Sequence, residues 1–328
     1  MPWLTQFDSI KSRLQVKYYP SAWSCARAVI REEGLRGLFR GVTIPVVTIT
    51  FVRTSSFSIY TNTKSWLAAR FGKDENKDLR RTALYGALGG VTSGAVISCG
   101  SAPFELVKVQ RQLEFLIHSQ KQKALAPGQP AVPFKPQTGT QAALDIFRTH
   151  GGLRGFYLGF PLHMARDTLG TALYFGLYDT IRAVGDRLEA RKQTLGIPSP
   201  VLSFLIGSTA GILSWLLVYP VDLLKTQAQR NALAGSPKVS AGQVFKQLLF
   251  EHGPDSASAA AGASRRQVMG VPLYRILRLY RGLGISAVRS FISHGITWMI
   301  IETISRHLEE VGPQKSWHLL DIDYLDYQ

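Results

Sequence analysis

Three short segments of the sequence each place an acidic residue three positions before a lysine. The two side chains then lie on one face of a helix, from which they can form ion pairs with neighbouring helices. Charges in the interior of a membrane protein require such partners. A glutamine follows four residues after each lysine, and the complete sets are Asp8, Lys11 and Gln15; Glu105, Lys108 and Gln112; and Asp222, Lys225 and Gln229. One copy would indicate only a solvated helix pair, but three copies favour ion pairs in a bundle interior.

A second group of charged residues falls in the middle of apolar segments, where each charge is costly unless it faces a partner or water. Arg166 and Asp167 are adjacent, and Arg289 lies in a later segment. Asp167 can bind a cationic group and Arg289 a carboxylate, so the set fits a zwitterionic ligand best. The alternative that Arg166 and Asp167 simply neutralise each other remains open.

Three more residues are candidates for the same site. Arg53 offers a second guanidinium for a carboxylate, and Trp215 offers an aromatic face to a quaternary ammonium. Packing against lipid is an equally good account of Trp215, and it is the favoured account of Trp298. His294 is included although a histidine on an apolar face is more often a packed core residue than a ligand.

The composition places these residues in a membrane protein. The chain has 328 residues, 45% of them hydrophobic and 18% charged, with a net charge of +16, which excludes a disordered chain. Residues 82–104 and 193–221 contain no charge, and each could cross a hydrocarbon core of about 30 Å as a helix. No aromatic-basic motif of a nucleic-acid binder, no catalytic constellation and no metal or cofactor motif is found in the sequence, so a transporter is favoured over an enzyme.

A threefold repeat positions the charged motifs. Each unit consists of an apolar helix, the acid-lysine motif, a polar segment, a glycine-rich turn and a second apolar helix; the turn is found at 34–41, 152–159 and, shortened, 279–282. The repeats span 1–72, 73–192 and 193–312, followed by a C-terminal tail at 313–328. Spanning segments are expected at about 41–64, 82–111, 159–183, 200–228 and 282–306. Residues 119–140 and 254–270 are expected to be surface insertions without a site.

Two pairs of glycines indicate close helix packing rather than substrate binding. Gly90 and Gly94 precede the proline of the second repeat, and Gly207 and Gly211 stand at the same offset in the third.

The triplicated motif, with Pro103 and Pro220 two residues before the acids of the second and third copies, resembles the mitochondrial carrier family over nearly the whole chain. This resemblance implies an all-α membrane protein with three repeats of two transmembrane helices around a central site, and one short helix on the matrix surface in each repeat. The first copy has Gln6 where the family has proline, and only a few residues precede it. We therefore expect the first transmembrane helix to be missing, through a splice form, an alternative start or a gene-model error, which leaves five spanning helices.

The resemblance also assigns roles to the charged residues. It makes the three acid-lysine-glutamine sets a matrix gate of ion pairs between repeats. On the cytoplasmic side it implies a weaker gate of two ion pairs, because Thr61 and Ser305 occupy the remaining acid and base positions. This weaker gate predicts a bias toward opening on the cytoplasmic side. The cytoplasmic gate residues are Tyr60, Lys64, Tyr178, Asp179, Arg182 and Glu302.

By the same resemblance, Thr48, Arg166 and Arg289 occupy the level at which the family contacts substrate. The Arg166–Asp167 pair, with Arg289, resembles the residues found in the carnitine/acylcarnitine and basic amino acid branch of the family. We therefore expect exchange of carnitine or its esters across the mitochondrial inner membrane by alternating access. There are two alternatives: a carrier of basic or other amino acids, and a truncated form that does not transport. Expected partners are the small-molecule substrate and membrane lipid such as cardiolipin, with no nucleic acid and no cofactor, and the chain is expected to be a monomer.

Overall fold

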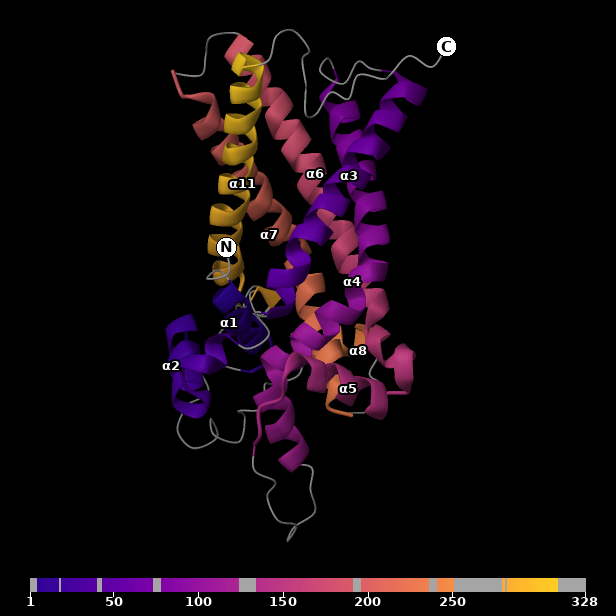
Figure 1. The fold of residues 1–328 in the computed structure, drawn as a ribbon, viewed down its shortest axis with the longest axis vertical. Coiled ribbons are helices and arrows are strands. Elements are labelled where there is room, and N and C mark those ends of the chain that lie inside the picture. Colours follow the sequence, from indigo (N-terminus) through magenta and orange to yellow (C-terminus); the bar gives the residue numbers. More distant parts are fainter. Residues whose placement is uncertain are drawn as a thin grey trace. The chain divides into compact units, whose positions relative to one another are not determined.

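The computed structural model describes residues 5–17, 19–39, 43–72, 78–123, 134–190, 196–235, 241–250, 279–280 and 282–311. Within these ranges the chain forms α-helices, 3-10 helices and turns and no strand, so the all-α prediction is confirmed (Figure 1). The expected insertion at 254–270 and the tail at 313–328 lie outside the described residues.

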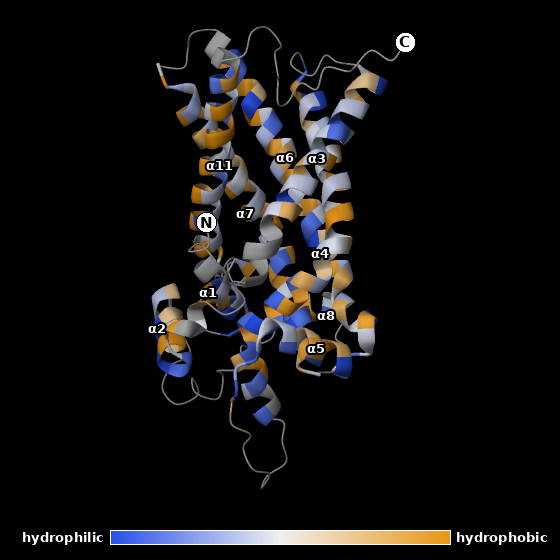
Figure 2. Cartoon of the chain, in the orientation of Figure 1, coloured by the Kyte–Doolittle hydropathy of each residue, from blue (hydrophilic) through white to orange (hydrophobic). Residues whose placement is uncertain are grey.

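Five long helices correspond to the five predicted spanning segments, and each begins within about three residues of its predicted start. They are α3 (Thr43–Phe71), α4 (Leu79–Lys123), α6 (Phe160–Ala190), α7 (Ser199–Leu233) and α11 (Leu283–Val311). The shortest have 29 residues, about 44 Å at 1.5 Å per residue, which exceeds the hydrocarbon thickness. By length and composition, residues 79–119 of α4 and 199–233 of α7 could cross a membrane. Apolar residues are frequent along all the long helices (Figure 2).

Short helices precede α3 and follow α4 and α7 in the chain. They are α1 (Thr5–Val16), α2 (Ala22–Glu33), α5 (Gly139–Thr149) and α8 (Ala241–Phe250), with 3-10 helices η2 (Leu35–Phe39) and η3 (Gly152–Tyr157). Capping boxes start two of them: Ser21 and Ser24 exchange backbone and side-chain hydrogen bonds at α2, and Thr138 and Gln141 do so at α5. These caps satisfy amide groups that the first helical turn leaves without partners.

The chain divides into two compact units. Unit 1 contains residues 1–47, 102–163 and 219–284, and unit 2 contains 48–101, 164–218 and 285–328. In α4 and α7 the division falls within two residues of Pro103 and Pro220, which lie inside these helices. Proline removes a backbone hydrogen bond and bends a helix. The boundary therefore coincides with the point in each helix where a backbone hydrogen bond is missing.

Unit 1 has an apolar core between α4 and α5. Leu106, Val109 and Leu113 on α4 pack in one cluster with Ala142 and Ile146 on α5, all of them buried. This packing buries the apolar face of the amphipathic helix α5.

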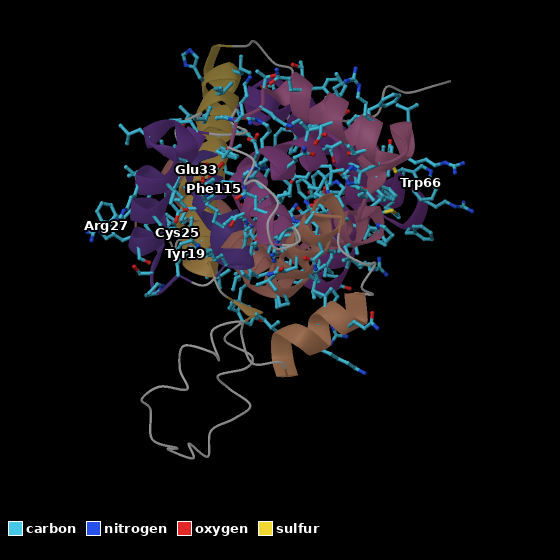
Figure 3. All side chains as sticks on the ribbon, turned by 90° about the horizontal axis from the view of Figure 1, so that it is seen from below. Tyr19, Cys25, Arg27, Glu33, Trp66 and Phe115 are labelled. Carbon is cyan, nitrogen blue, oxygen red and sulfur yellow. The ribbon has the colours of Figure 1, made fainter. Side chains whose placement is uncertain are left out.

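The start of unit 1 is held by a buried ion pair between α1 and the end of α2. Arg13 bonds Glu33, and both side chains are almost completely buried. Burial, followed by the nearby Cys25 thiol and Glu32 carboxylate, raises the pKa of Tyr19 to about 12, so its phenol stays protonated at neutral pH. Figure 3 labels Tyr19, in the segment between α1 and α2, and Cys25, Arg27 and Glu33 on α2, with the Arg27 side chain pointing outward. Trp66 on α3, also labelled there, is exposed.

In unit 2 the two glycine pairs are contact points between helices. A Cβ on Gly90 would lie 2.4 Å from the carbonyl oxygen of Thr171 on α6, and one on Gly94 would lie 2.6 Å from the Cα of Thr168. On α7, a Cβ on Gly207 would lie 2.5 Å from Trp298, and one on Gly211 would lie 2.7 Å from Ser290, both on α11. The glycines therefore allow α4 to approach α6, and α7 to approach α11, as the spacing predicts.

We expect Gly90→Ala to destabilise the protein by about 1–3 kcal/mol, because the new methyl group overlaps backbone atoms that cannot move independently of α6. Thermal unfolding in detergent measures the effect. Gly100→Ala is the matched control on the same helix, since a Cβ there would meet no atom within 4 Å. Equal melting temperatures for the two variants would show that α4 and α6 are not in close contact at Gly90.

Candidate substrate-binding site and ion-pair networks

The predicted substrate residues Arg166, Asp167, Trp215 and Arg289 come together within unit 2. Asp167 accepts a hydrogen bond of 2.5 Å from Nη1 of Arg166. The guanidinium groups of Arg166 and Arg289 lie 5.0 and 5.6 Å from the centre of the Trp215 ring, within cation-π range. The side chain of Trp215 is buried, and the protein's own arginines contact it. A quaternary ammonium would therefore have to displace an arginine to reach this ring.

Arg53 and His294 belong to the same region. Arg53 is exposed and interacts electrostatically with Tyr174, Arg166 and Arg289. The ring of His294 lies 4.4 Å from that of Tyr174, so this histidine packs against an aromatic residue. The side chain of Thr48 lies outside the described residues.

The electrostatic character of this site follows from its charged groups. Arg53, Arg166 and Arg289 carry three positive charges, and Asp167 carries one negative charge, for a net charge of +2. Such a site can bind a carboxylate through an arginine that Asp167 does not neutralise. Its one carboxylate can bind an ammonium group only in competition with Arg166.

In unit 1, an ion pair connects the first and third repeats. Lys11 on α1 lies 2.6 Å from Oδ2 of Asp222 on α7, and the amide of Gln15 donates a 2.8 Å hydrogen bond to the same oxygen. The side chains of Lys11 and Asp222 are only 10% and 5% exposed. The Lys11 ammonium also lies 5.7 Å from the ring centre of the buried Tyr219. Tyr219 was missed by the sequence analysis, although it directly precedes the proline of its repeat.

A second ion pair connects the third and second repeats. Lys225 on α7 lies 3.0 Å from Glu105 on α4, and Lys108 lies 3.7 Å from Glu105 on its own helix. Gln112 accepts a hydrogen bond from Ser12 on α1. The side chain of Asp8, the acid of the first repeat, lies outside the described residues.

Gln229 is buried and lies against the turn glycine of the preceding repeat. Gly159 has a φ of +72°, and a Cβ on it would lie 2.9 Å from Cγ of Gln229. Both the backbone conformation and the contact favour glycine at this position.

The predicted cytoplasmic gate residues form two groups in unit 2, and the members of each group contact one another. In the first, the Tyr60 hydroxyl donates to both oxygens of Asp179 at 2.7 Å, and Lys64 lies 3.2 Å from Asp179. The Tyr60 ring stacks on Phe175 with centroids 3.9 Å apart. Thr61 donates to carbonyl groups of its own helix, and within the described part of the chain it makes no hydrogen bond to a neighbouring repeat.

The second group joins α6, α7 and α11. Arg182 lies 3.1 Å from Glu302, and Ser203 accepts from Arg182 and donates to Glu302. Tyr178 stacks on Trp298 with centroids 3.7 Å apart, and Trp298 donates a 2.6 Å hydrogen bond to the Tyr174 hydroxyl.

The prediction that Trp298 faces lipid is wrong. Trp298 is only 4% exposed and belongs to an apolar cluster with Tyr178, Ile206 and Ala210. A signal for this contact was present in the sequence, because Gly207 provides the space that the Trp298 ring fills. No feature of the sequence indicates that Ser203 bridges Arg182 and Glu302.

We expect Tyr60→Phe to destabilise unit 2 by about 1.5–3 kcal/mol, because a buried carboxylate loses hydrogen bonds from a hydroxyl while the ring stacking is kept. The change should also raise the fraction of molecules open at this gate. Tyr178→Phe is the matched control, since it preserves a similar stack and its hydroxyl makes no hydrogen bond to the described residues. Melting temperature and alkylation of a cysteine placed at Ser203 report the two effects. Identical results for the two variants would contradict a gating role for Tyr60.

Long helices that could span a membrane, with charges in their interior held by partners from other repeats, define a multi-pass carrier of repeat architecture. The chain belongs to the mitochondrial carrier protein family, whose sequence profile matches residues 3–71, 80–186 and 198–272. It is therefore a multi-pass protein of the mitochondrial inner membrane, and members of this family are transporters of small molecules.

Several curated relatives are similar along most of the chain. Mitochondrial ornithine transporter 1 of Schizosaccharomyces pombe is 27% identical over 90% of this chain and 84% of its own length. The human mitochondrial basic amino acids transporter is 31% identical over 71% and 68%, respectively. The mitochondrial arginine transporter BAC2 of Arabidopsis thaliana is 26% identical over 89% and 81%.

Proposed function

We propose that this carrier exchanges amino acids, including those with basic side chains, across the mitochondrial inner membrane. The observation that carries the proposal is Asp167, a carboxylate bonded to Arg166, which in turn interacts electrostatically with Arg53 as Arg289 does, all within unit 2. Every amino acid has an α-ammonium group for the carboxylate and an α-carboxylate for an arginine. The arrangement thus matches the part of the substrate that all members of the class share.

The expectation of a carnitine substrate is not supported. The relatives described above are named for ornithine, arginine and basic amino acids, which favours the amino acid alternative. The contact of Trp215 with two guanidinium groups points the same way, because the aromatic face that would recognise a quaternary ammonium already has cationic partners.

Alternating access follows from the two sets of ion pairs in this proposal. The network of Lys11, Asp222, Lys225 and Glu105 acts as the matrix gate, and the network of Tyr60, Lys64, Asp179, Arg182 and Glu302 acts as the cytoplasmic gate. Substrate binding stabilises the state in which a gate opens by offsetting the lost ion pairs, so one substrate is exchanged for another. The same proposal includes α3, α4, α6, α7 and α11 as spanning helices, a monomeric carrier, and cardiolipin as a lipid partner.

Exchange by the purified chain in liposomes tests the proposal. Liposomes are loaded with arginine, and uptake of labelled arginine is measured in competition with ornithine, with citrulline and with carnitine. Citrulline matches arginine in length and lacks its side-chain charge, so it measures what the basic group contributes. We expect arginine and ornithine to compete and carnitine to fail. Uptake that carnitine esters inhibit and amino acids do not would overturn the proposal.

A further inference from the structure

Arg53, Tyr174 and His294 form a cluster of hydrogen-bond donors within unit 2. Arg53 lies on α3, Tyr174 on α6 and His294 on α11, so each repeat contributes one residue. The rings of Tyr174 and His294 have centroids 4.4 Å apart, and Arg53 interacts electrostatically with both residues. Arg53 is exposed, and the other two side chains are partly exposed. The cluster is therefore open to a ligand rather than sealed by packing.

Packing holds the two rings of the cluster in place. Trp298, which is buried, donates a 2.6 Å hydrogen bond to the hydroxyl oxygen of Tyr174. A Cβ on Gly211 of α7 would lie 2.8 Å from Cδ2 and 3.2 Å from Cγ of His294, so a carbon edge of the imidazole ring lies against α7. Neither contact uses the Tyr174 hydrogen or an imidazole nitrogen.

The three side chains have donors that no described residue uses. Within the described part of the chain, Arg53 makes no ion pair or hydrogen bond, and the His294 ring makes no hydrogen bond. The Tyr174 oxygen accepts from Trp298, which leaves its own hydrogen to donate. A guanidinium, a phenol O–H and the one N–H of a neutral imidazole are all donors. The cluster thus fits a ligand that accepts hydrogen bonds.

The charges around Arg53 favour an anionic ligand. The charged groups of the described residues with which Arg53 interacts electrostatically are the guanidinium groups of Arg166 and Arg289, which have the same sign as its own. A charge within a spanning helix requires a partner or water, and a confined site with an excess of one charge concentrates ions of the opposite sign.

The nearby carboxylates have other partners. Asp167 bonds Arg166. Asp179, which interacts electrostatically with Tyr174, accepts hydrogen bonds from Tyr60 and pairs with Lys64. Neither acid is therefore committed to the cluster.

The cluster lies at a different depth from the charged residues assigned to the substrate. His294 follows Arg289 by five residues on α11, about 7.5 Å along the helix axis, and Tyr174 follows Asp167 by seven residues on α6, about 10.5 Å. The α-carboxylate and α-ammonium of an amino acid, bound at Arg289 and Asp167, therefore do not satisfy the donors of the cluster.

We propose that Arg53, Tyr174 and His294 bind a small inorganic anion, such as chloride, at a site additional to the substrate site. The guanidinium supplies the positive charge, and the hydroxyl and the imidazole N–H supply two further donors. An anion at this position lowers the positive charge that a basic substrate meets in the middle of unit 2.

Thermal unfolding of the purified full chain in sodium chloride and sodium gluconate tests the site. Gluconate is the matched control, because it has the same charge as chloride and is too large for the cluster. Ionic strength is held constant, so that screening of the ion pairs is equal. We expect the melting temperature to rise in a saturable manner as chloride replaces gluconate. A melting temperature that does not depend on chloride would overturn the proposal.

Variants assign the shift to the cluster. Arg53→Gln should abolish the chloride response, and Tyr174→Phe should weaken chloride binding by about tenfold, the loss of one hydrogen bond to a charged partner. Arg70→Gln removes an exposed arginine in the last turn of the same helix and should respond like the unmodified chain. A full chloride response in Arg53→Gln or in Tyr174→Phe would contradict the assignment.

The side-chain carboxylate of an acidic substrate is the other anion that would fit these donors. Sodium glutamate is therefore compared with glutamine, which has the same length and no side-chain charge. We expect no difference between the two in their effect on the melting temperature. A shift with glutamate that Arg53→Gln abolishes, without a shift from chloride, would assign the cluster to the substrate side chain and overturn the proposal of a free anion.

The role of the anion in transport rests on the proposed function. We expect the KM for arginine exchange in liposomes to be several-fold lower in chloride than in gluconate, and the KM for citrulline to be nearly equal in the two salts. An equal KM for arginine in both salts would overturn this role. Absence of arginine exchange in either salt would contradict the proposed function and not the anion site, which thermal unfolding measures without substrate.

Discussion

Replacement of Asp167 by asparagine is expected to raise the apparent KM for arginine exchange by about 10- to 150-fold. The change removes one charge-assisted hydrogen bond to the substrate ammonium, worth about 1.5–3 kcal/mol, and each 1.4 kcal/mol is a factor of ten in affinity. It also leaves the positive charges of Arg166 and Arg289 without their neighbouring carboxylate, which further disfavours a cationic substrate. Exchange in liposomes over a range of arginine concentrations measures the effect.

The matched control for this prediction is Asp186→Asn on the same helix. Asp186 is 49% exposed and pairs with Arg182 one turn away, and exposed pairs of this kind contribute about 0–1 kcal/mol. Exchange by this variant should be nearly unchanged. If Asp167→Asn kept the original KM, Asp167 would be only a structural partner of Arg166, which is the simpler interpretation that the sequence leaves open.

The repeated motif made the ion-pair positions predictable. Lys11, Asp222, Lys225 and Glu105 each occur at the same place in a repeat, so three copies identify interior charges where one copy could not. The partners within each pair come from the resemblance, because sequence spacing alone gives the face of a helix and not the helix opposite to it. The structure brings Lys11 to Asp222 and Lys225 to Glu105, so partners are exchanged between repeats.

The contacts of aromatic and hydroxyl side chains were not predictable in the same way. The stack of Tyr178 on Trp298 and the bridge of Ser203 between Arg182 and Glu302 depend on the rotation of α7 and α11 about their axes. Tyr178 has a repeat counterpart in Tyr60, but a repeated position does not specify which side chain of a neighbouring helix it contacts. The apolar pattern of a spanning helix does not separate a lipid-facing surface from a bundle interior, since both are apolar.

The substrate was the least predictable feature. Arg166, Asp167 and Arg289 indicate a zwitterion from their charges alone, and this description fits carnitine and amino acids equally. Trp215 appeared to favour carnitine because an aromatic ring recognises a quaternary ammonium. Which cation contacts that ring depends on the conformations of two long arginine side chains, and the sequence contains no information on them.

Replacement of Asp222 by asparagine is expected to destabilise the protein by about 3 kcal/mol. Lys11 would remain buried without the carboxylate that neutralises it, and removal of one partner of a buried ion pair costs about 3–5 kcal/mol. The asparagine keeps the shape of the site and can still accept the hydrogen bond from Gln15. We therefore expect a loss of stability at the lower end of this range. Thermal unfolding measures the effect, with Asp78→Asn as the control, because Asp78 is 49% exposed and should contribute little.

An exchange of charges distinguishes a specific pair from a general need for a carboxylate at this position. In the unmodified protein the charged groups of Lys11 and Asp222 are 2.6 Å apart. The double variant Lys11→Asp with Asp222→Lys again places one positive and one negative charge at these positions, so we expect it to recover part of the lost stability. Recovery should be incomplete because the Gln15 amide, which donates to Asp222, would then face an ammonium group. If the double variant were as unstable as the sum of its single changes, Lys11 and Asp222 would not be energetically coupled, and the ion pair could not serve as a gate whose opening substrate binding must offset.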